Sequence, residues 1–378
     1  MADASVAIVG GGVVGAAVAY ALARRGVAAV LLEAEGELAS GASGTNSGIL
    51  HTGFDSKPGE LETRLILRAG ELRPSVLEDL AVPVVHCGAR LEPRTADERA
   101  IVERVAAGAH SNGVEVVLAN DGTLDVPGEA LTDPVAYTRA LASAAEAAGA
   151  EIRTNARVGA IRREADGLVV ETDDGAAVEC TVAVNCAGLR ADGVARLAGD
   201  ESFGIYPRKG EFFVFEQAEP LERILLPVPT ERTKGVLVFP TVDGKVIAGP
   251  TAVDGEDKDD WTVRPEAEAE VMAKARTMWP PLEGAEPIAS YAGLRPAGRD
   301  GANYWIAHSR ACPGLVNVAA IRSTGLTASL GIGEYVAALL AERGLELGPD
   351  RPLPPGRPPG SRELPWWRRA GLLHAAVT

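Results

Sequence analysis

The N-terminal segment alternates short apolar runs with turns rich in glycine. Residues 6–9 are apolar and predict a β-strand, residues 13–25 are rich in alanine and predict a helix, and residues 27–32 predict a second strand. Residues 10–15, between the first strand and the helix, read Gly-Gly-Gly-Val-Val-Gly. This succession of strand, glycine turn, helix and strand is typical of a βαβ unit that binds a dinucleotide.

Three glycines of this turn are predicted to have separate roles. Gly10 permits the tight turn, Gly12 lets the backbone approach a pyrophosphate, and Gly15 lets the helix pack closely on the strand. Free N–H groups at the start of the helix favour a phosphate, and Glu33 ends the second strand about where a carboxylate would bind an adenosine ribose. A βαβ turn that binds no ligand is the alternative. The expected nucleotide-binding residues are Gly10, Gly12, Val14, Gly15, Glu33 and Ala34.

The rest of the pattern predicts a second, β-rich unit inserted into the nucleotide-binding unit. Helices are expected over residues 60–80, 95–112, 134–148 and from 323–327 to 340. Strands are expected over residues 82–91, 151–154, 158–163, 168–172, 177–184, 204–214, 236–239, 245–247 and 315–320. The predicted fold class is α/β with α+β elements: a Rossmann-like nucleotide-binding domain with an inserted antiparallel-sheet substrate domain. The first domain would comprise residues 1–83, 131–203 and 312–345, the second 84–130 and 204–311, with a Pro-rich tail over 346–378.

Two further stretches of small residues indicate which dinucleotide binds. One is a loop over residues 39–48, and the other is the start of the last predicted helix at 323–327. Taken alone, the first would be a surface linker and the second a capped helix. Together with the glycine turn they supply a pyrophosphate cradle, donors around a ring edge, and a positive helix end near the N1–C2=O of a flavin. We therefore predict FAD as the cofactor, contacted also by Ser43, Gly44, Thr45, Asn46, Ser47, Gly48, Val158, Ala187, Gly188, Leu189, Gly293, Arg295, Ser323, Thr324, Gly325, Leu326 and Thr327.

Composition and cysteine spacing exclude several other classes. Lys and Arg total 37 against 52 acidic residues, and a net charge of −15 argues against binding to nucleic acid. The four cysteines form no C-x-x-C pair, so the usual zinc and iron–sulfur spacings are absent and a reducing cytoplasm is expected. No apolar stretch approaches the roughly 18 residues of a spanning helix. There is also no second G-x-G-x-x-G for NAD(P)H, so the electrons should come from a substrate bound beside the flavin.

Several segments resemble one family of flavoproteins. Residues 43–54, 57–59, 207–211 and 233–251 resemble the FAD-dependent glycerol-3-phosphate dehydrogenase family, whose members have a D-amino-acid-oxidase-like fold. Residues 291–296 and 323–327 are also similar to L-2-hydroxyglutarate dehydrogenases, and the resemblance covers roughly residues 5 to 342. The chain lacks the cysteine-rich extension of many members, which leaves the electron acceptor open among oxygen, a quinone and a protein carrier. Arg322 stands where relatives commonly have an acid.

The resemblance implies an enzyme that acts on CH–OH donors by hydride transfer from a secondary alcohol to flavin N5. The first choice of substrate is sn-glycerol 3-phosphate, oxidised to dihydroxyacetone phosphate, and the second is L-2-hydroxyglutarate. An amino-acid or amine oxidase of the same fold and a non-enzymatic nucleotide-binding protein stay open as alternatives.

Four residues are candidates for catalysis or substrate binding. His51 directly follows the small-residue loop, and an imidazole, with an unperturbed pKa of about 6.5, suits a general base. Arg295 is the candidate anchor for an anionic group, because a guanidinium offers a bidentate fork. A structural histidine and a buried Arg–carboxylate pair are the respective alternatives. Lys209 and Arg322 are weaker candidates for the same pocket, with paired surface positions as their alternative.

The tail carries a further pattern, Trp366-Trp367-Arg368-Arg369, followed by two leucines. Such a segment could lie in a membrane interface and bring the flavin near a quinone. The alternative, which we favour, is a tail that packs on the body of the protein or stays mobile. The expected localisation is cytoplasmic, with peripheral contact to the inner face of the membrane if the tail binds it.

Overall fold

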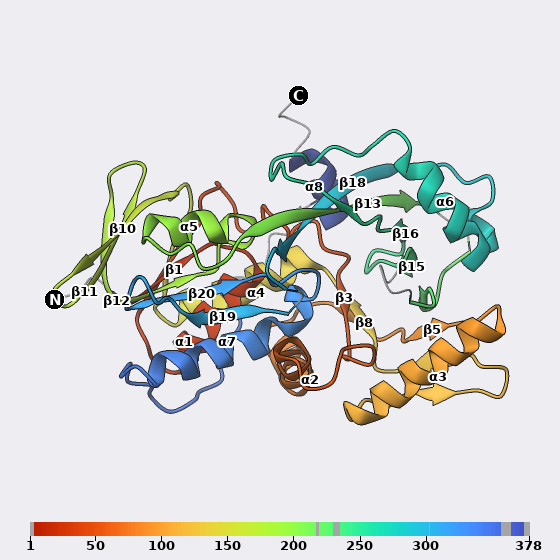
Figure 1. The fold of residues 1–378 in the computed structure, drawn as a ribbon, viewed down its shortest axis with the longest axis horizontal. Coiled ribbons are helices and arrows are strands. Elements are labelled where there is room, and N and C mark those ends of the chain that lie inside the picture. The colour runs from red at the N-terminus through yellow and green to blue at the C-terminus, as the bar shows by residue number, and fades with distance from the viewer. Residues whose placement is uncertain (1–3, 217–218, 230–234, 302, 357–363, 374–378) are drawn as a thin grey trace.

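The first of two large sheets is built around the N-terminal strand β1 (Ala4–Val9). This strand lies between β2 (Ala29–Leu32) and β12 (Ala177–Asn185) and is parallel to both, so segments far apart in the sequence share the sheet. The computed structural model describes residues 4–216, 219–229, 235–301, 303–356 and 364–373. Within these residues the sheet has eight strands (Figure 1). The others are β9 (Glu151–Arg153), β10 (Val158–Glu164), β11 (Gly167–Thr172), β19 (Trp305–His308) and β20 (Leu315–Ala319).

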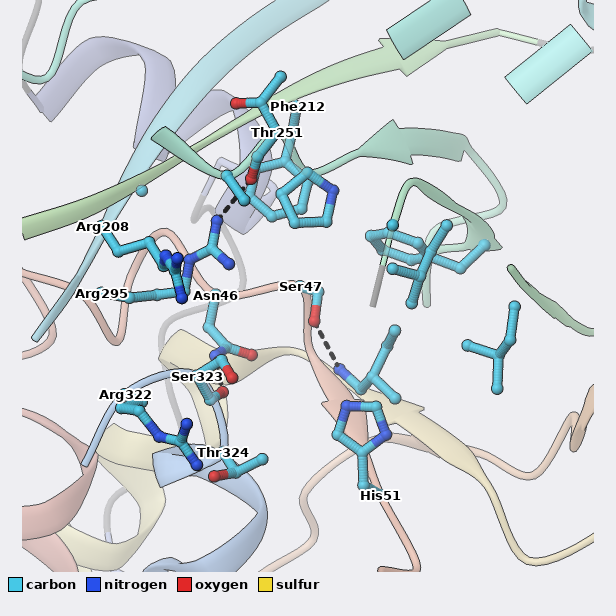
Figure 2. Close-up of a pocket in the computed structure, with 18 of the residues that line it drawn as sticks. Asn46, Ser47, His51, Arg208, Phe212, Thr251, Arg295, Arg322, Ser323 and Thr324 are labelled. Atoms are coloured by element: carbon cyan, nitrogen blue, oxygen red, sulfur yellow. Dashed lines mark hydrogen bonds between the residues drawn. The ribbon is translucent and has the colours of Figure 1, made fainter. Parts of the chain in front are cut away.

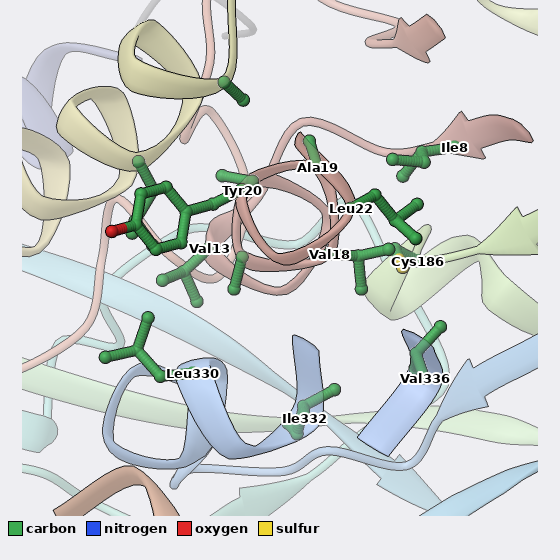
Figure 3. Close-up of a cluster of buried hydrophobic side chains, with 14 of the residues drawn as sticks. Ile8, Val13, Val18, Ala19, Tyr20, Leu22, Cys186, Leu330, Ile332 and Val336 are labelled. Carbon is green, nitrogen blue, oxygen red and sulfur yellow. The ribbon is translucent and has the colours of Figure 1, made fainter. Parts of the chain in front are cut away.

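Helix α1 (Val13–Arg24) is the centre of the layer that covers one face of this sheet. Figure 3 shows α1 end-on, with apolar side chains of α7 (Gly325–Ala341) facing it and those of Ile8 in β1 and of Cys186, directly after β12, beside it. The two helices come so close that a Cβ on Gly333 would lie 2.5 Å from the carbonyl oxygen of Ala17. The same layer contains α2 (Leu61–Asp79) and α4 (Pro134–Ala147), while α5 (Ala191–Leu197), after the short 3-10 helix η1 (Gly188–Arg190), lies on the opposite face.

The second sheet is largely antiparallel and centres on the long strand β13 (Ile205–Phe215). This strand pairs along almost its whole length with β18 (Ala289–Gly298), and the register sets Arg208 opposite Arg295. The described part of this sheet has nine strands. The others are β5 (Ala89–Leu91), β6 (Val117–Leu118), β7 (Leu124–Val126), β14 (Ile224–Leu226), β15 (Leu237–Pro240), β16 (Val246–Gly249) and β17 (Val253–Asp254), with α3 (Ala96–Ser111), α6 (Ala267–Met278) and η2 (Pro280–Leu282) beside them. A small sheet of β3 (Ile49–Leu50), β8 (Ala130–Thr132) and β4 (Val84–Val85) lies between the two large ones (Figure 1).

The predicted fold class is confirmed, because a sheet with a parallel core and a largely antiparallel second sheet are both present. Several strands differ from expectation, and β7, β8, β14 and β19 are among those that were not predicted. The strand expected over 82–91 is interrupted where Gly88 takes a positive φ of 67°. Strand β18 was not predicted, since its glycines and Pro296 break the pattern of a strand interior. The domain boundaries stay a prediction, and β19, assigned above to the substrate domain, pairs with β20 in the first sheet.

The C-terminal helix α8 (Trp366–Leu373) packs on the second sheet. The ring of Trp366 meets that of Tyr291 edge-on, with centroids 5.6 Å apart, and Trp367 Nε1 donates a hydrogen bond to Asp243 Oδ2 at 3.0 Å. Both indole rings are buried, so the membrane-interface alternative for these tryptophans is not supported and the packed alternative is the one observed. Among the helices within the described ranges, none combines the length and apolar character needed to cross a bilayer.

Replacing Trp367 with phenylalanine is expected to lower the free energy of unfolding by about 1–2 kcal/mol. The smaller ring leaves a gap and removes the hydrogen bond to Asp243. Urea unfolding of the holoenzyme measures the change. Leu372→Ala, at an exposed position of the same helix, is the matched control and should leave the midpoint unchanged. An unchanged midpoint for Trp367→Phe would mean that α8 is not docked in solution.

Candidate active site

Two glycines of the turn after β1, Gly10 and Gly15, have no room for a side chain. Gly10 takes a φ of +111°, and a Cβ on Gly15 would lie 1.9 Å from the Gly10 carbonyl oxygen. Gly12 is extended and starts α1 without a side-chain cap of its own. Instead Ser43 Oγ, from the small-residue loop, accepts the Val13 N–H at 2.9 Å. The turn therefore brings bare backbone and a positive helix end to the carboxyl edge of the first sheet, a common place for phosphates.

Glu33 lies directly beside this turn. Its Oε2 accepts the Gly11 N–H at 2.5 Å, and its Oε1 accepts the Glu35 N–H at 2.9 Å. Burial raises the pKa of Glu33, and these two N–H donors oppose the rise. Residues 187–189 also adjoin the turn, because a Cβ on Gly10 would lie 3.0 Å from the Cα of Ala187.

Other residues expected near the nucleotide lie around the same edge of the first sheet. Val158 lies at the start of β10, which forms a hairpin with β11. Its side chain packs on the apolar cluster between this hairpin and strands β1 and β2. The side chain of Val14 lies within 3.8 Å of a Cβ built on Gly325, so α1 and α7 meet at their N-terminal ends. Ala34 follows Glu33 at a half-buried position.

The small-residue loop at 43–48 joins the glycine turn to the start of α7. At one end Ser43 bonds α1, and further along Asn46 Nδ2 donates to the carbonyl oxygen of Ser323 at 3.4 Å. Thr327 Oγ1 accepts the His51 N–H at 3.1 Å and donates to the Ile49 carbonyl at 3.2 Å. The three segments that the sequence singled out therefore converge in space.

A cavity of about 370 Å³ opens beside this junction, between the first sheet's loops and the second sheet (Figure 2). Its volume lies within the usual range of small-molecule and cofactor sites, about 300–1,000 Å³. Among its polar lining residues are Thr45, Asn46, Ser47, His51, Arg208, Thr251, Arg295, Arg322, Ser323 and Thr324. On the side of β18, Gly293 lets the strand approach the loop, since a Cβ there would lie 3.0 Å from the Thr45 carbonyl oxygen.

Helix α7 begins at this cavity without a side-chain cap. The hydroxyl of Thr324, which precedes the helix, donates instead to Glu62 Oε1 at 2.6 Å, and it also contacts the Tyr304 hydroxyl at 2.6 Å. Ser323 and Thr324 both line the cavity. The first N–H groups of α7 therefore form a positive pole at its edge.

His51 lies at the floor of the cavity in Figure 2. Its Nδ1 lies 2.8 Å from Oε2 of Glu129, a carboxylate with no exposed surface. Sequence analysis did not single out Glu129, because the 78 residues that separate it from His51 leave no local signal of the contact. The weak signal available is an acid set directly before the apolar strand β8.

Arg295 reaches the cavity from β18. Its Nη2 donates to the Thr251 carbonyl at 2.7 Å and lies 3.3 Å from the Lys209 carbonyl oxygen. Burial, with the charge of Arg208 as a second cause, lowers the pKa of Arg295 to about 10. A Cβ on Gly210 would lie 2.2 Å from the guanidinium, so glycine on the facing strand makes room for it.

The remaining cations occupy different environments. Arg208 lines the cavity and pairs with Asp254 at 2.7 Å. The neighbouring Lys209 points to the other side of β13, where it pairs with Asp260 at 2.5 Å and donates to the Thr262 carbonyl at 3.0 Å. The structure therefore does not bring Lys209 into the cavity.

Arg322 does line the cavity, but it is ion-paired there with Glu62 of α2. Its φ of +47° lies in the left-handed region, and its N–H donates to the Pro296 carbonyl at 3.1 Å. The pairing leaves both predictions for Arg322 open, substrate binding and a merely paired position. A paired guanidinium at a cavity wall still offers donors to a ligand.

Comparison with known proteins gives a consistent result. A family model described as FAD dependent oxidoreductase matches residues 5–339. The chain is 29% identical to the glycerol 3-phosphate dehydrogenase of Caloramator mitchellensis over 353 residues, which is 89% of this chain and 73% of that one. It is also 29% identical to the L-2-hydroxyglutarate dehydrogenase of Escherichia coli K12 over 270 residues, 65% of this chain and 63% of that one. The structure of dithionite-reduced L-α-glycerophosphate oxidase from Mycoplasma pneumoniae, with FAD bound, superposes with a TM-score of 0.84 at 28% identity, covering 91% of this chain and 96% of that one.

The residues present fit this cofactor. Gly12 leaves open backbone at the N-terminal end of α1, and the uncapped start of α7 faces the cavity. The buried Nε of Arg322, at the cavity wall, has no hydrogen-bond partner among the described residues. The predicted cofactor and class are thereby confirmed: the chain belongs to the family of FAD-dependent oxidoreductases.

Proposed function

We propose that this flavoenzyme oxidises a small anionic secondary alcohol, with sn-glycerol 3-phosphate, converted to dihydroxyacetone phosphate, as the first choice. The observation that carries the proposal is the pair Arg208 and Arg295, which line one cavity together with His51 (Figure 2). Two guanidinium groups on facing positions of β13 and β18 suit a phosphate dianion, which accepts several charge-assisted hydrogen bonds. Two of the relatives above are named for the same substrate, which supports this choice.

In this proposal the chain's own residues bind the alcohol and take its proton. When bound, FAD supplies the acceptor for a hydride at flavin N5. The Nε2 of His51, the ring nitrogen turned away from Glu129, takes the proton of the alcohol. Arg295 and Arg208 hold the anionic group. Apolar side chains limit the water around the reacting atoms; they are Phe54, Leu91, Phe212, Leu237 and Phe239.

For the cofactor, we assign roles to three segments. The pyrophosphate would lie against residues 10–15 and the start of α1, and Glu33 would accept hydrogen bonds from the adenosine ribose. The ring would lie between the loop at 43–48, Gly293 and the first residues of α7, whose positive end favours negative charge on the ring.

L-2-Hydroxyglutarate is the second candidate, and a third cation favours it. Arg322 lines the same cavity, so it could hold a second carboxylate apart from the one at Arg295. Arg322 is paired with Glu62, as Arg208 is with Asp254. We rank this dicarboxylate below the phosphate because the match to L-2-hydroxyglutarate dehydrogenase covers 65% of this chain, against 89% for glycerol 3-phosphate dehydrogenase.

An anaerobic substrate panel tests the proposal. The purified flavoprotein is mixed without oxygen with glycerol 3-phosphate, L-2-hydroxyglutarate, glycine or an N-methyl amine, and absorbance is followed at the flavin maximum. We expect bleaching by glycerol 3-phosphate. Bleaching by the dicarboxylate alone would select the second candidate, and bleaching only by an amino acid or amine would overturn oxidation of an alcohol. Repeating the assay in air with an oxygen electrode separates an oxidase from a dehydrogenase.

Replacing Arg295 with lysine is expected to raise KM by about 10-fold or more while FAD stays bound. An ammonium group cannot present the bidentate fork, and it is hydrated more strongly than a guanidinium. Steady-state kinetics at several substrate concentrations measure the change. Arg299→Lys is the matched control, because Arg299 is half-exposed and pairs with Glu256. Unchanged KM and turnover in Arg295→Lys would exclude Arg295 from substrate binding.

A further inference from the structure

Every polar group of His51 except one is held by the protein. The backbone N–H donates to Thr327 Oγ1 at 3.1 Å, the carbonyl accepts from Arg73 Nη2 at 2.8 Å, and Nδ1 lies 2.8 Å from Glu129 Oε2. No described residue forms a hydrogen bond with Nε2, and the ring lines the cavity. The two backbone contacts and the contact of Nδ1 with Glu129 therefore fix the orientation of the imidazole, and Nε2 is left at the cavity.

Glu129 is itself oriented by two donors of Thr52. Its Oε1 accepts the Thr52 N–H at 2.7 Å and the Thr52 hydroxyl at 3.0 Å, which leaves Oε2 for His51. Pairing of β3 with β8 brings the two segments together, since Leu50 is opposite Ala130. A fully buried carboxylate is costly unless donors surround it. Here Oε1 has two donors and Oε2 has His51 Nδ1 as its partner, so both oxygens of the carboxylate are positioned by contacts.

We propose that Glu129 is a positioning residue for the alcohol oxidation proposed above, on which this inference rests. A carboxylate only accepts hydrogen bonds, so Glu129 keeps the imidazole proton on Nδ1 and leaves the lone pair on Nε2 facing the cavity. When the O–H bond of the alcohol breaks, its proton forms an N–H bond at Nε2, while the electron pair of the C–H bond leaves as hydride to FAD. Glu129 then stabilises the resulting imidazolium through Nδ1–H.

Glu129→Gln distinguishes this role from simple packing. The amide oxygen must face the two donors of Thr52, so the NH₂ group faces Nδ1, which must then accept. The imidazole proton moves to Nε2, where it blocks the base. We expect kcat to fall by about 10²-fold or more with KM changed by less than about threefold. Because Glu129 acts through His51, the double variant with His51→Gln should be no slower than His51→Gln alone.

A second measurement needs no substrate. Long-range ¹H–¹⁵N spectra of the holoenzyme with ¹⁵N-labelled histidine, with His51 assigned by its loss in His51→Gln, show which ring nitrogen carries the proton. We expect Nδ1–H in the wild type and Nε2–H in Glu129→Gln. A proton on Nε2 in the wild type, or a Glu129→Gln variant with unchanged tautomer and kcat, would overturn the proposal. An Nδ1–H tautomer in a protein that oxidises no alcohol would support the positioning role and contradict the proposed function.

Discussion

Replacing His51 with glutamine is expected to lower the turnover of the proposed substrate by about 10²-fold or more, with FAD still bound. A glutamine amide does not accept a proton near neutral pH, so the alcohol loses its base. The glycine turn and the start of α7 are unaffected, so the protein should stay yellow. Steady-state kcat and the flavin absorbance of the purified variant give the two readouts.

His110→Gln is the matched control for this prediction. His110 lies at an exposed position near the end of α3 and does not line the cavity. Its replacement should change neither turnover nor flavin content. If His51→Gln turned over at a rate close to that of the wild type, His51 would have to be removed from the mechanism.

Gly15→Ala, which adds a single methyl group, is expected to abolish FAD binding or to raise the Kd for FAD by at least about 10²-fold. The new Cβ would lie 1.9 Å from the carbonyl oxygen of Gly10, which is a backbone atom, and a Cβ has no rotatable bond that could move it away. Helix α1 must therefore move from the turn, which distorts the expected pyrophosphate site. Flavin released on denaturation and titration of the apoprotein with FAD measure the loss.

Gly193→Ala is a control of the same chemistry. Gly193 lies in α5, where a Cβ would meet no atom within 4 Å. This variant should bind FAD like the wild type. FAD binding of normal strength in Gly15→Ala would contradict the role given to the close approach at this turn.

The nucleotide-binding half could be predicted from the sequence because its signals are local. A strand, a glycine turn and a helix follow one another within residues 4–24, and each glycine is required by an atom that lies nearby in the fold. Helices α2, α3 and α4 were also predicted, since each buries one face, whereas α5, α6 and α8 were not.

The substrate side was harder to predict, because its residues meet only across strands. Arg208 and Lys209 are neighbours in β13, and side chains alternate between the two faces of a strand. Only one of the two can enter the cavity, and this rule could have been applied to the sequence. Which of the two enters depends on the pairing with β18. That strand was not predicted, because its glycines and proline are atypical of a strand interior.

The partners of buried charges left no usable trace in the sequence. Glu129 contacts His51 from a strand that pairs with β3, and Glu62 contacts Arg322 from the start of α2. Each contact joins residues far apart in the chain, and neither spacing nor periodicity encodes it. Sequence analysis placed His51 and Arg322 at the site, but only the fold reveals the acids that contact them.

The central position of β1 bears on when FAD can bind during synthesis of the chain. This strand is synthesised before its partner β12, and β12 in turn pairs with β20 near residue 315. His51, the proposed base, depends on a still later segment, because its backbone N–H donates to Thr327 Oγ1. Flavin loading is therefore expected to follow synthesis of the chain through α7, and a nascent chain that stops short of α7 should be colourless although it already carries the complete glycine motif.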